Sequence, residues 1–276
     1  MPVSAPGPPT EVEHWRAPLR MVFGPSNSER ESGTGDVDMV EYLGKRLGRP
    51  AELIRRSSYS EENELLRSGY CDLALVSGYA YLVGQRDFGL EPVAVPLVKG
   101  DSQCCSYLIV GADSPAGEWS DLLGKTFAFT DPLSTSGYVA PRYELMLRGE
   151  TPDSFFRRTI FTYGDDNSVR AVAEKLVDAA AVESLAYDRM AALSPGLLKK
   201  TKIIARSEHF GAPLVVVNSQ MSRTLREQLR EAFLDMNHSP VGRTALEQIG
   251  AERFISPDPH LYDWDRDMSE KMLVAP

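Results

Sequence analysis

Short apolar runs alternate with helical patterns along the first third of the chain. The predicted elements are strands at 19–23, 51–54 and 73–76 and helices over 37–47 and 61–67. The first helix is closed by Gly48 and Pro50, two residues that stop helices. Strands that alternate with helices are typical of a mainly parallel sheet, so we expect an α/β lobe here.

A second series of the same kind begins near residue 100. Its predicted elements are strands at 106–110, 126–130, 159–162 and 179–182 and helices over 136–148, 168–176 and 184–193. A strand at 213–217 follows, and helices over 222–236 and 240–249 have Ser222 and Ser239 as their expected N-caps. The segment 258–267 is polar and aromatic, and we expect it on the surface. The pattern therefore predicts two α/β units.

Length and charge narrow the class of protein. The chain has 276 residues, near the size at which single cores divide, which favours two lobes. The net charge of −9 argues against a nucleic-acid partner, and no apolar run approaches the roughly 18 residues of a membrane span. Residues 1–18 are polar and rich in proline, without the apolar core of a secretion signal. We expect a disordered or leader-remnant N-terminus, which leaves a cytoplasmic location and a removed leader both open.

The most specific stretch follows the predicted strand at 126–130. After Asp131 and Pro132, the chain places Ser134, Thr135 and Ser136 at the start of a helix. Unpaired amides, hydroxyl donors and the positive end of the helix dipole together form a cradle for an anion. The alternative is that Ser134 or Thr135 only caps the helix.

The motif DPLSTSGY, together with VDAAAVES, CDLALVSGYAYL and DSQCCSYLIVGADSP, resembles the periplasmic phosphate/phosphonate-binding proteins of the PhnD type over about 19–254. The resemblance implies a type II periplasmic-binding-protein fold: two α/β lobes, joined by two crossover strands, with a ligand cleft between them. It places the crossovers near 100–106 and 208–213. It divides the chain into lobe 1 (19–105 plus 212–276) and lobe 2 (106–211), and it implies export to the periplasm.

The same resemblance implies a set of ligand-binding residues. Lobe 2 contributes Ser134, Thr135 and Ser136. The residues implied for lobe 1 are Ser26 or Asn27, Ser58, Tyr59, Ser77 and Tyr79. The two tyrosines could equally be ordinary half-buried aromatics.

The chain departs from the phosphonate pattern at three places. Cys104 and Cys105 stand where phosphonate binders have a tyrosine followed by an aromatic residue, Asp165 replaces a histidine, and Ala212 replaces an aspartate. A thiol is a soft ligand suited to trivalent arsenic, and a nearby helix N-terminus is expected to lower its pKa. Cys104 is the first choice and Cys105 the second, because only one of two adjacent side chains can face a cleft.

The acidic pair Asp165 and Asp166 bears on the charge of the ligand, and Cys71 is expected to lie outside the site. Asp165 and Asp166 would repel a dianion but not neutral arsenous acid, although Asp166 could instead cap a helix beginning near Asn167. Three cysteines are too few for a disulfide framework, and Cys71 is expected to be structural.

The sequence thus predicts a monomeric, non-enzymatic periplasmic protein that binds a small inorganic oxyanion. The favoured ligand is arsenite, with a membrane sensor histidine kinase as partner, as in the arsenite-sensing (AioX-type) members of the family. The alternative is the phosphate-, phosphite- or phosphonate-binding component of an ABC transporter, with a permease as partner. A second alternative is a cysteine-dependent enzyme, with His209 as the candidate base. No cofactor or metal motif is present, since CxxC, HExxH and GxGxxG are all missing.

Overall fold

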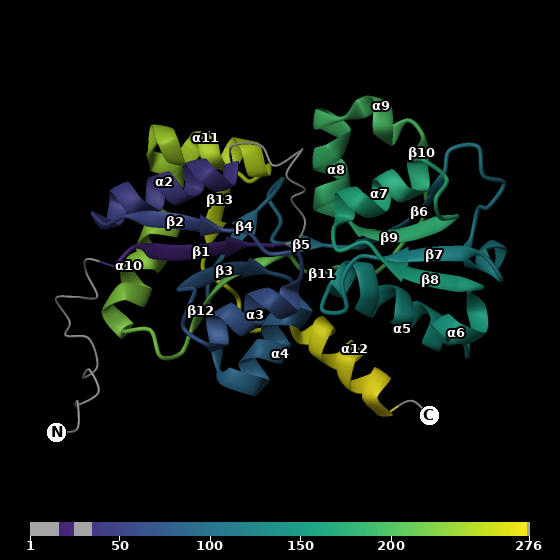
Figure 1. The fold of residues 1–276 in the computed structure, drawn as a ribbon, viewed down its shortest axis with the longest axis horizontal. Coiled ribbons are helices and arrows are strands. Elements are labelled where there is room, and N and C mark those ends of the chain that lie inside the picture. Colours follow the sequence, from purple (N-terminus) through teal and green to yellow (C-terminus); the bar gives the residue numbers. More distant parts are fainter. Residues whose placement is uncertain (1–16, 25–34, 275–276) are drawn as a thin grey trace, which may run out of the picture.

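Two α/β lobes lie side by side in the computed structural model, which describes residues 17–24 and 35–274 (Figure 1). The type II fold expected from the sequence is confirmed. The expectations for residues 1–16, and for Ser26 and Asn27, fall outside the described residues. The lobe boundaries at 105/106 and 211/212 stay predictions.

The first lobe is built on a six-stranded sheet in the order β13-β4-β12-β3-β1-β2. Its strands are β1 (Leu19–Phe23), β2 (Ala51–Ile54), β3 (Leu73–Val76), β4 (Leu90–Leu97), β12 (Leu214–Asn218) and β13 (Arg253–Ile255). β1 pairs in parallel with β2 and β3, whereas β12 runs antiparallel to its neighbours. One face packs on α2 (Gly35–Leu47), α10 (Arg223–Leu234) and α11 (Pro240–Ile249), and the other on α3 (Tyr59–Arg67) and α4 (Gly78–Phe88).

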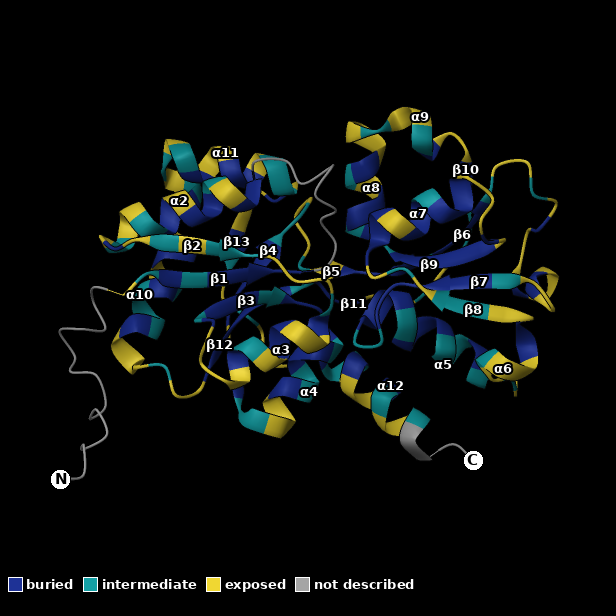
Figure 2. Ribbon diagram, viewed as in Figure 1, coloured by how far each residue is buried: buried dark blue, intermediate teal, exposed yellow. Residues whose placement is uncertain are grey.

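The second lobe has a five-stranded sheet in the order β10-β6-β9-β7-β8. Its strands are β6 (Ser106–Gly111), β7 (Thr126–Phe129), β8 (Arg158–Phe161), β9 (Ala179–Glu183) and β10 (Thr201–Arg206). One face is covered by α7 (Asp165–Ala173), α8 (Ser184–Leu193) and α9 (Pro195–Leu198), and the other by η1 (Trp119–Leu122), α5 (Ala140–Met146) and α6 (Pro152–Phe155). The central strands are buried, and the edge strands β2 and β8 are partly exposed (Figure 2).

A two-stranded ribbon joins the lobes. It pairs β5 (Gln103–Cys104) with β11 (Phe210–Gly211) in antiparallel register, within the two segments expected to cross. The ribbon places Cys104 opposite Phe210 at the junction of the lobes.

The C-terminal segment contradicts the sequence prediction of a surface tail. It forms α12 (Asp263–Val274), which packs on α4 of one lobe and on α5 of the other (Figure 1). Tyr262 and Asp265 are buried, and the Trp264 ring stacks on Phe210 with 5.0 Å between ring centroids. The segment therefore packs against the hinge through its apolar and aromatic side chains. Of its polar residues, Asp265 is buried, whereas Arg266 and Asp267 are exposed. Within the described residues, no helix has the length and apolar character needed to cross a membrane.

Candidate functional site

A small cavity lies between the lobes, and we call it the interlobe cavity. Its volume is about 10 Å³, which is the room needed by about one water molecule. Its walls come from the ends of strands, the starts of helices and the hinge ribbon. The lining residues are Tyr59, Ser77, Gly78, Cys104, Ser134, Thr135, Ser136, Asp165, Glu183, Phe210, Gly211 and Pro213. Open α/β sheets favour ligand sites at such carboxyl ends of strands.

Residues Ser134–Gly137, here named the Ser134 turn, form the wall from the second lobe. Ser134 caps the helical turn η2 (Thr135–Val139), which runs directly into α5, and its Oγ accepts from the Gly137 amide at 2.9 Å. A side chain at Gly137 would overlap Thr130, so the turn packs closely on the end of β7. Ser134 therefore both caps the helix and lines the cavity, and its role as a ligand for an anion stays a prediction.

Besides a bond from Thr135 to Asp265 of α12, three hydrogen bonds cross from one lobe to the other around the cavity. The Thr135 hydroxyl accepts from the Tyr79 amide at 2.9 Å, and the Ser77 hydroxyl donates to the Leu133 carbonyl at 2.5 Å. The Tyr59 amide donates to Asp131 at 3.1 Å. Two of the predicted ligand-binding hydroxyls, those of Ser77 and Thr135, thus hold the lobes together in this conformation.

Cys104 lines the interlobe cavity and Cys105 does not. The Cys104 thiol donates to the Gly211 carbonyl oxygen at 3.8 Å, and Glu183 lines the same cavity. Burial, and then the negative charges of Glu183 and Asp265, raise the pKa of Cys104 well above its ordinary value. The expectation that a helix N-terminus lowers this pKa is wrong, because desolvation and acidic neighbours dominate.

Two buried carboxyl groups lie beside the thiol. The Glu183 amide donates to Asp165 at 2.8 Å. Burial raises the pKa of Asp165 to about 6 and that of Glu183 to about 8, while Arg189 acts in the opposite direction on both. Glu183 was not predicted as a site residue from the sequence. It lies within the VDAAAVES motif and is the last residue of β9, so it stands at the carboxyl end of a buried strand.

The structure also places several other residues that the sequence analysis named. The helix predicted to begin near Asn167 begins at Asp165, so Asp166 is not its cap; the Asp166 carboxyl is buried and has no hydrogen-bond partner among the described residues. Ser58 caps α3 instead of lining the cavity, and Tyr79 contributes only its amide. Cys71 is buried and donates to the Leu73 carbonyl at 2.9 Å, consistent with a structural role.

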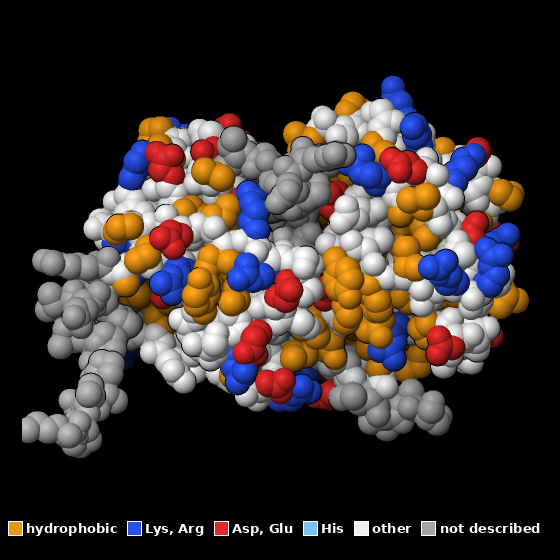
Figure 3. Space-filling view, in the orientation of Figure 1, with side chains coloured by type: hydrophobic (Ala, Val, Ile, Leu, Met, Phe, Trp, Pro, Cys, Tyr) orange, Lys and Arg blue, Asp and Glu red, His pale blue; other side chains and the backbone are white. Residues whose placement is uncertain are grey.

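The interlobe cavity has no basic wall. None of its lining residues is Lys, Arg or His, and His209 is exposed and outside the lining. On the face seen in Figure 3, basic and acidic side chains are mixed. Among the described residues, no group of three or more His, Cys, Asp or Glu side chains could hold a metal ion. Within this lining, the groups able to donate to an anion are hydroxyls and amides.

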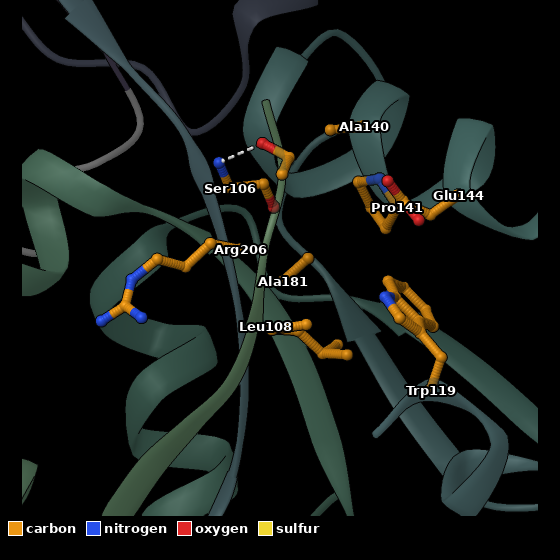
Figure 4. Close-up of a pocket in the computed structure, with 10 residues that line it drawn as sticks. Ser106, Leu108, Trp119, Ala140, Pro141, Glu144, Ala181 and Arg206 are labelled. Atoms are coloured by element: carbon orange, nitrogen blue, oxygen red, sulfur yellow. Dashed lines mark hydrogen bonds between the residues drawn. The ribbon is translucent and has the colours of Figure 1, made fainter. Parts of the chain in front are cut away.

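A second cavity of similar size lies within the second lobe and shares no lining residue with the first (Figure 4). At its edge, the Ser106 amide donates to the Ser207 hydroxyl at 2.9 Å, and the Ser106 hydroxyl donates to the Ser136 carbonyl at 2.6 Å. Leu108 and Trp119 form part of its wall, and Arg206 extends away from the other labelled side chains in Figure 4. Ser106 thus ties the crossover to the Ser134 turn.

Two α/β lobes on a short ribbon, with a polar cavity enclosed between them, define a bilobed binding protein. The family described as the periplasmic substrate-binding protein of a phosphonate ABC transporter matches residues 21–262. The chain belongs to this family.

Two curated proteins and one solved structure illustrate the likeness. The phosphonates-binding periplasmic protein of Escherichia coli is 32% identical over 52% of this chain, and the match spans 44% of that protein. The phosphate-import protein PhnD of Mycolicibacterium smegmatis is 25% identical over 81% of this chain and 73% of its own. A binding component of an ABC phosphonate transporter from Pseudomonas aeruginosa has a TM-score of 0.87 at 20% identity, covering 92% of this chain and 86% of that one.

Proposed function

We propose that this chain is the substrate-binding component of an ABC transporter for phosphate or a small phosphonate. It would work in the periplasm as a monomer, without a cofactor, and deliver its ligand to a membrane permease. The observation that carries the proposal is the Ser134 turn at a helix N-terminus, facing Tyr59 and Ser77 of the other lobe across one cavity. Membership of the family supports it.

Ligand entry requires the lobes to part. A tetrahedral oxyanion needs more room than a cavity of about 10 Å³ offers. The Ser77 hydroxyl, which now donates to Leu133, and the Thr135 hydroxyl, which now donates to Asp265, become free donors as the lobes separate. A ligand that binds the nearly closed form more tightly than the open form then shifts the population toward closure.

Arsenite is the second candidate ligand, and the Cys104 thiol favours it. Cys104 lines the same cavity as Ser134 and Ser136. Arsenous acid is neutral, so the acidic wall does not repel it. The protonated thiol would condense with it, forming one S–As bond and releasing one water molecule made from the thiol hydrogen and an arsenic hydroxyl. In that case the chain would signal to a membrane sensor histidine kinase instead of feeding a permease.

The cysteine-dependent enzyme has less support. Such an enzyme needs a base within hydrogen-bond reach of the thiol, and His209 does not line the cavity. The raised pKa of Cys104 also leaves the thiol protonated and a weak nucleophile.

Calorimetry with phosphate, phosphite, methylphosphonate and arsenite tests the proposal. Ser134→Ala removes the cap and a ligand donor together, so we expect phosphate or methylphosphonate affinity to fall at least about tenfold, the effect of about 1.4 kcal/mol. Ser222→Ala is the matched control, because Ser222 caps α10 in the same way far from the cavity. If none of the four ligands binds, or if both variants bind them as tightly as the wild type, the proposed function is wrong.

A further inference from the structure

The C-terminal helix α12 contacts both lobes beside the hinge (Figure 1). Tyr262, directly before α12, anchors it on the first lobe: its hydroxyl donates to the Ala212 carbonyl at 2.8 Å, and its ring lies edge-on to Tyr81 of α4. On the other side, the Trp264 ring lies edge-on to Tyr143 of α5, with 6.3 Å between the ring centroids. A rigid helix that is anchored on both lobes has to leave one of them when the lobes separate.

Asp265 is the residue of α12 that reaches the wall of the interlobe cavity. It is completely buried, and one of its oxygens accepts from the Thr135 hydroxyl of the Ser134 turn at 2.6 Å. A side chain at Gly78, which lines the cavity at the start of α4, would overlap the same oxygen of Asp265. The second Asp265 oxygen has no hydrogen-bond partner among the described residues. Asp265 thus lies where α12, the first residue of α4 and the Ser134 turn meet.

The Thr135 hydroxyl has no hydrogen left for a ligand in this conformation. A hydroxyl carries one hydrogen and two lone pairs. The hydrogen goes to Asp265, and a lone pair accepts from the Tyr79 amide of α4 at 2.9 Å. An anion needs a donor, so Thr135 can serve one only after it leaves Asp265. Thr135 is therefore held by α12 and by the first lobe at the place where the sequence pattern expects a ligand contact.

We propose that α12 is a latch that holds the empty protein closed, with Asp265 on Thr135 as its contact at the cavity, and that an entering oxyanion competes with this contact. The latched form encloses a cavity of about 10 Å³, the room of about one water molecule, and so excludes the ligand. The apparent affinity is then the intrinsic affinity multiplied by the fraction of molecules that are unlatched. The latch acts on the empty protein, and only its effect on affinity rests on the proposed function.

Asp265→Ala removes the acceptor and leaves the rest of the helix unchanged. Loss of one hydrogen bond should raise the ratio of open to closed empty protein at least about threefold, so the radius of gyration measured by small-angle X-ray scattering should increase. Because less of the protein is latched, the dissociation constant of inorganic phosphate, measured by calorimetry, should fall at least about threefold. A residue that only supported the folded site would have the opposite effect, since its loss would weaken phosphate binding.

Three further variants separate the latch from other effects. Asp265→Asn keeps an oxygen that accepts from Thr135, so its radius of gyration and its phosphate affinity should stay near those of the wild type. Asp267→Ala removes an exposed carboxylate of the same helix and should also match the wild type. Tyr143→Ala removes the second-lobe ring that contacts Trp264, outside the cavity lining, and should shift both measures in the same direction as Asp265→Ala. Thermal melting checks the folding of each variant.

Tyr143→Ala carries the test if Asp265→Ala does not fold. The latch is overturned if the folded variant is as compact as the wild type when empty, if it binds phosphate no more tightly than a wild type that does bind it, or if Asp267→Ala has the same effect. If phosphate does not bind the wild type while the empty variant expands, the latch stands and it is the proposed phosphate site that fails.

Discussion

At the scale of single residues, burial decides which chemistry the cavity can perform. Cys104 is 3% exposed and its neighbours are acidic, so its pKa is raised and its sulfur remains a thiol near neutral pH. A buried thiol among hydroxyls is a selective partner for a neutral metalloid acid and a poor donor to phosphate. The contribution of Cys104 to binding affinity thus depends on which ligand is bound.

Cys104→Ser tests this dependence. We expect arsenite affinity to fall at least about a hundredfold, equivalent to about 2.7 kcal/mol, because serine cannot form an S–As bond. Cys105→Ser is the matched control, because Cys105 is also buried and adjacent but lies outside the lining. Calorimetry checks both variants. Equal losses in the two variants, or none in Cys104→Ser, would remove the thiol from the site.

Local chemistry explains which site residues the sequence could predict. The Ser134 turn can be recognised from the sequence because its capping serine, its other hydroxyls and its glycine are contiguous. Glu183 carries no such local signal: a single acid at a strand end matters only once Asp165 and the hinge ribbon are packed beside it. The hydrogen bond from Ser77 to the Leu133 carbonyl could not be predicted from the sequence either, since it depends on how far the lobes are closed.

At the scale of elements, α12 links the hinge to the site. The Thr135 hydroxyl donates to Asp265 at 2.6 Å, while the second Asp265 oxygen is buried and has no hydrogen-bond partner among the described residues. Burial raises the pKa of Asp265 from 3.8 to about 7. A raised pKa means that the folded state holds this proton more tightly than the unfolded state does. The resulting stability is therefore present at low pH and is lost as the pH rises toward 7.

Asp265→Asn should remove the loss of stability that accompanies the rise in pH toward 7. Between about pH 4 and pH 7 we expect the free energy of unfolding of the wild type to fall relative to the variant by on the order of 1 kcal/mol per pH unit, and the difference to level off above pH 7. Denaturant titration at several pH values measures it. Asp267→Asn, on the exposed side of the same helix, should follow the wild type. A difference independent of pH would show that Asp265 does not titrate in this window.

Element prediction from the sequence succeeded where pattern and capping agree. The strands 19–23, 51–54 and 73–76 were predicted at their observed bounds, and Ser222 and Ser239 cap α10 and α11 as expected. β4 was missed because Pro92 and Pro96 argue against a strand; the pairing with β12 shifts register at Pro92, and Pro96 pairs with Phe254 of the edge strand β13. α4 was missed because two glycines and a weak apolar stripe obscure its helical period.

At the scale of the whole molecule, closure rests on few polar contacts. The four hydrogen bonds around the cavity, that from Thr135 to Asp265 included, are supplemented by an exposed ion pair between Lys99 and Asp188, at 3.1 Å, which contributes little in water. Each such hydrogen bond is worth about 1 kcal/mol, so opening is accessible to thermal motion. The lobes can thus admit a ligand and trap it without the loss of either core.

The most direct measurement is a crystal structure of the chain grown with arsenate, a tetrahedral analogue of phosphate whose arsenic is located by anomalous scattering. We expect an arsenic peak in the interlobe cavity, within hydrogen-bond reach of Ser134 and Ser136 on one lobe and of Tyr59 on the other. An arsenic bound elsewhere, with the Ser134 turn contacting only protein atoms, would show that the interlobe cavity is not the oxyanion site.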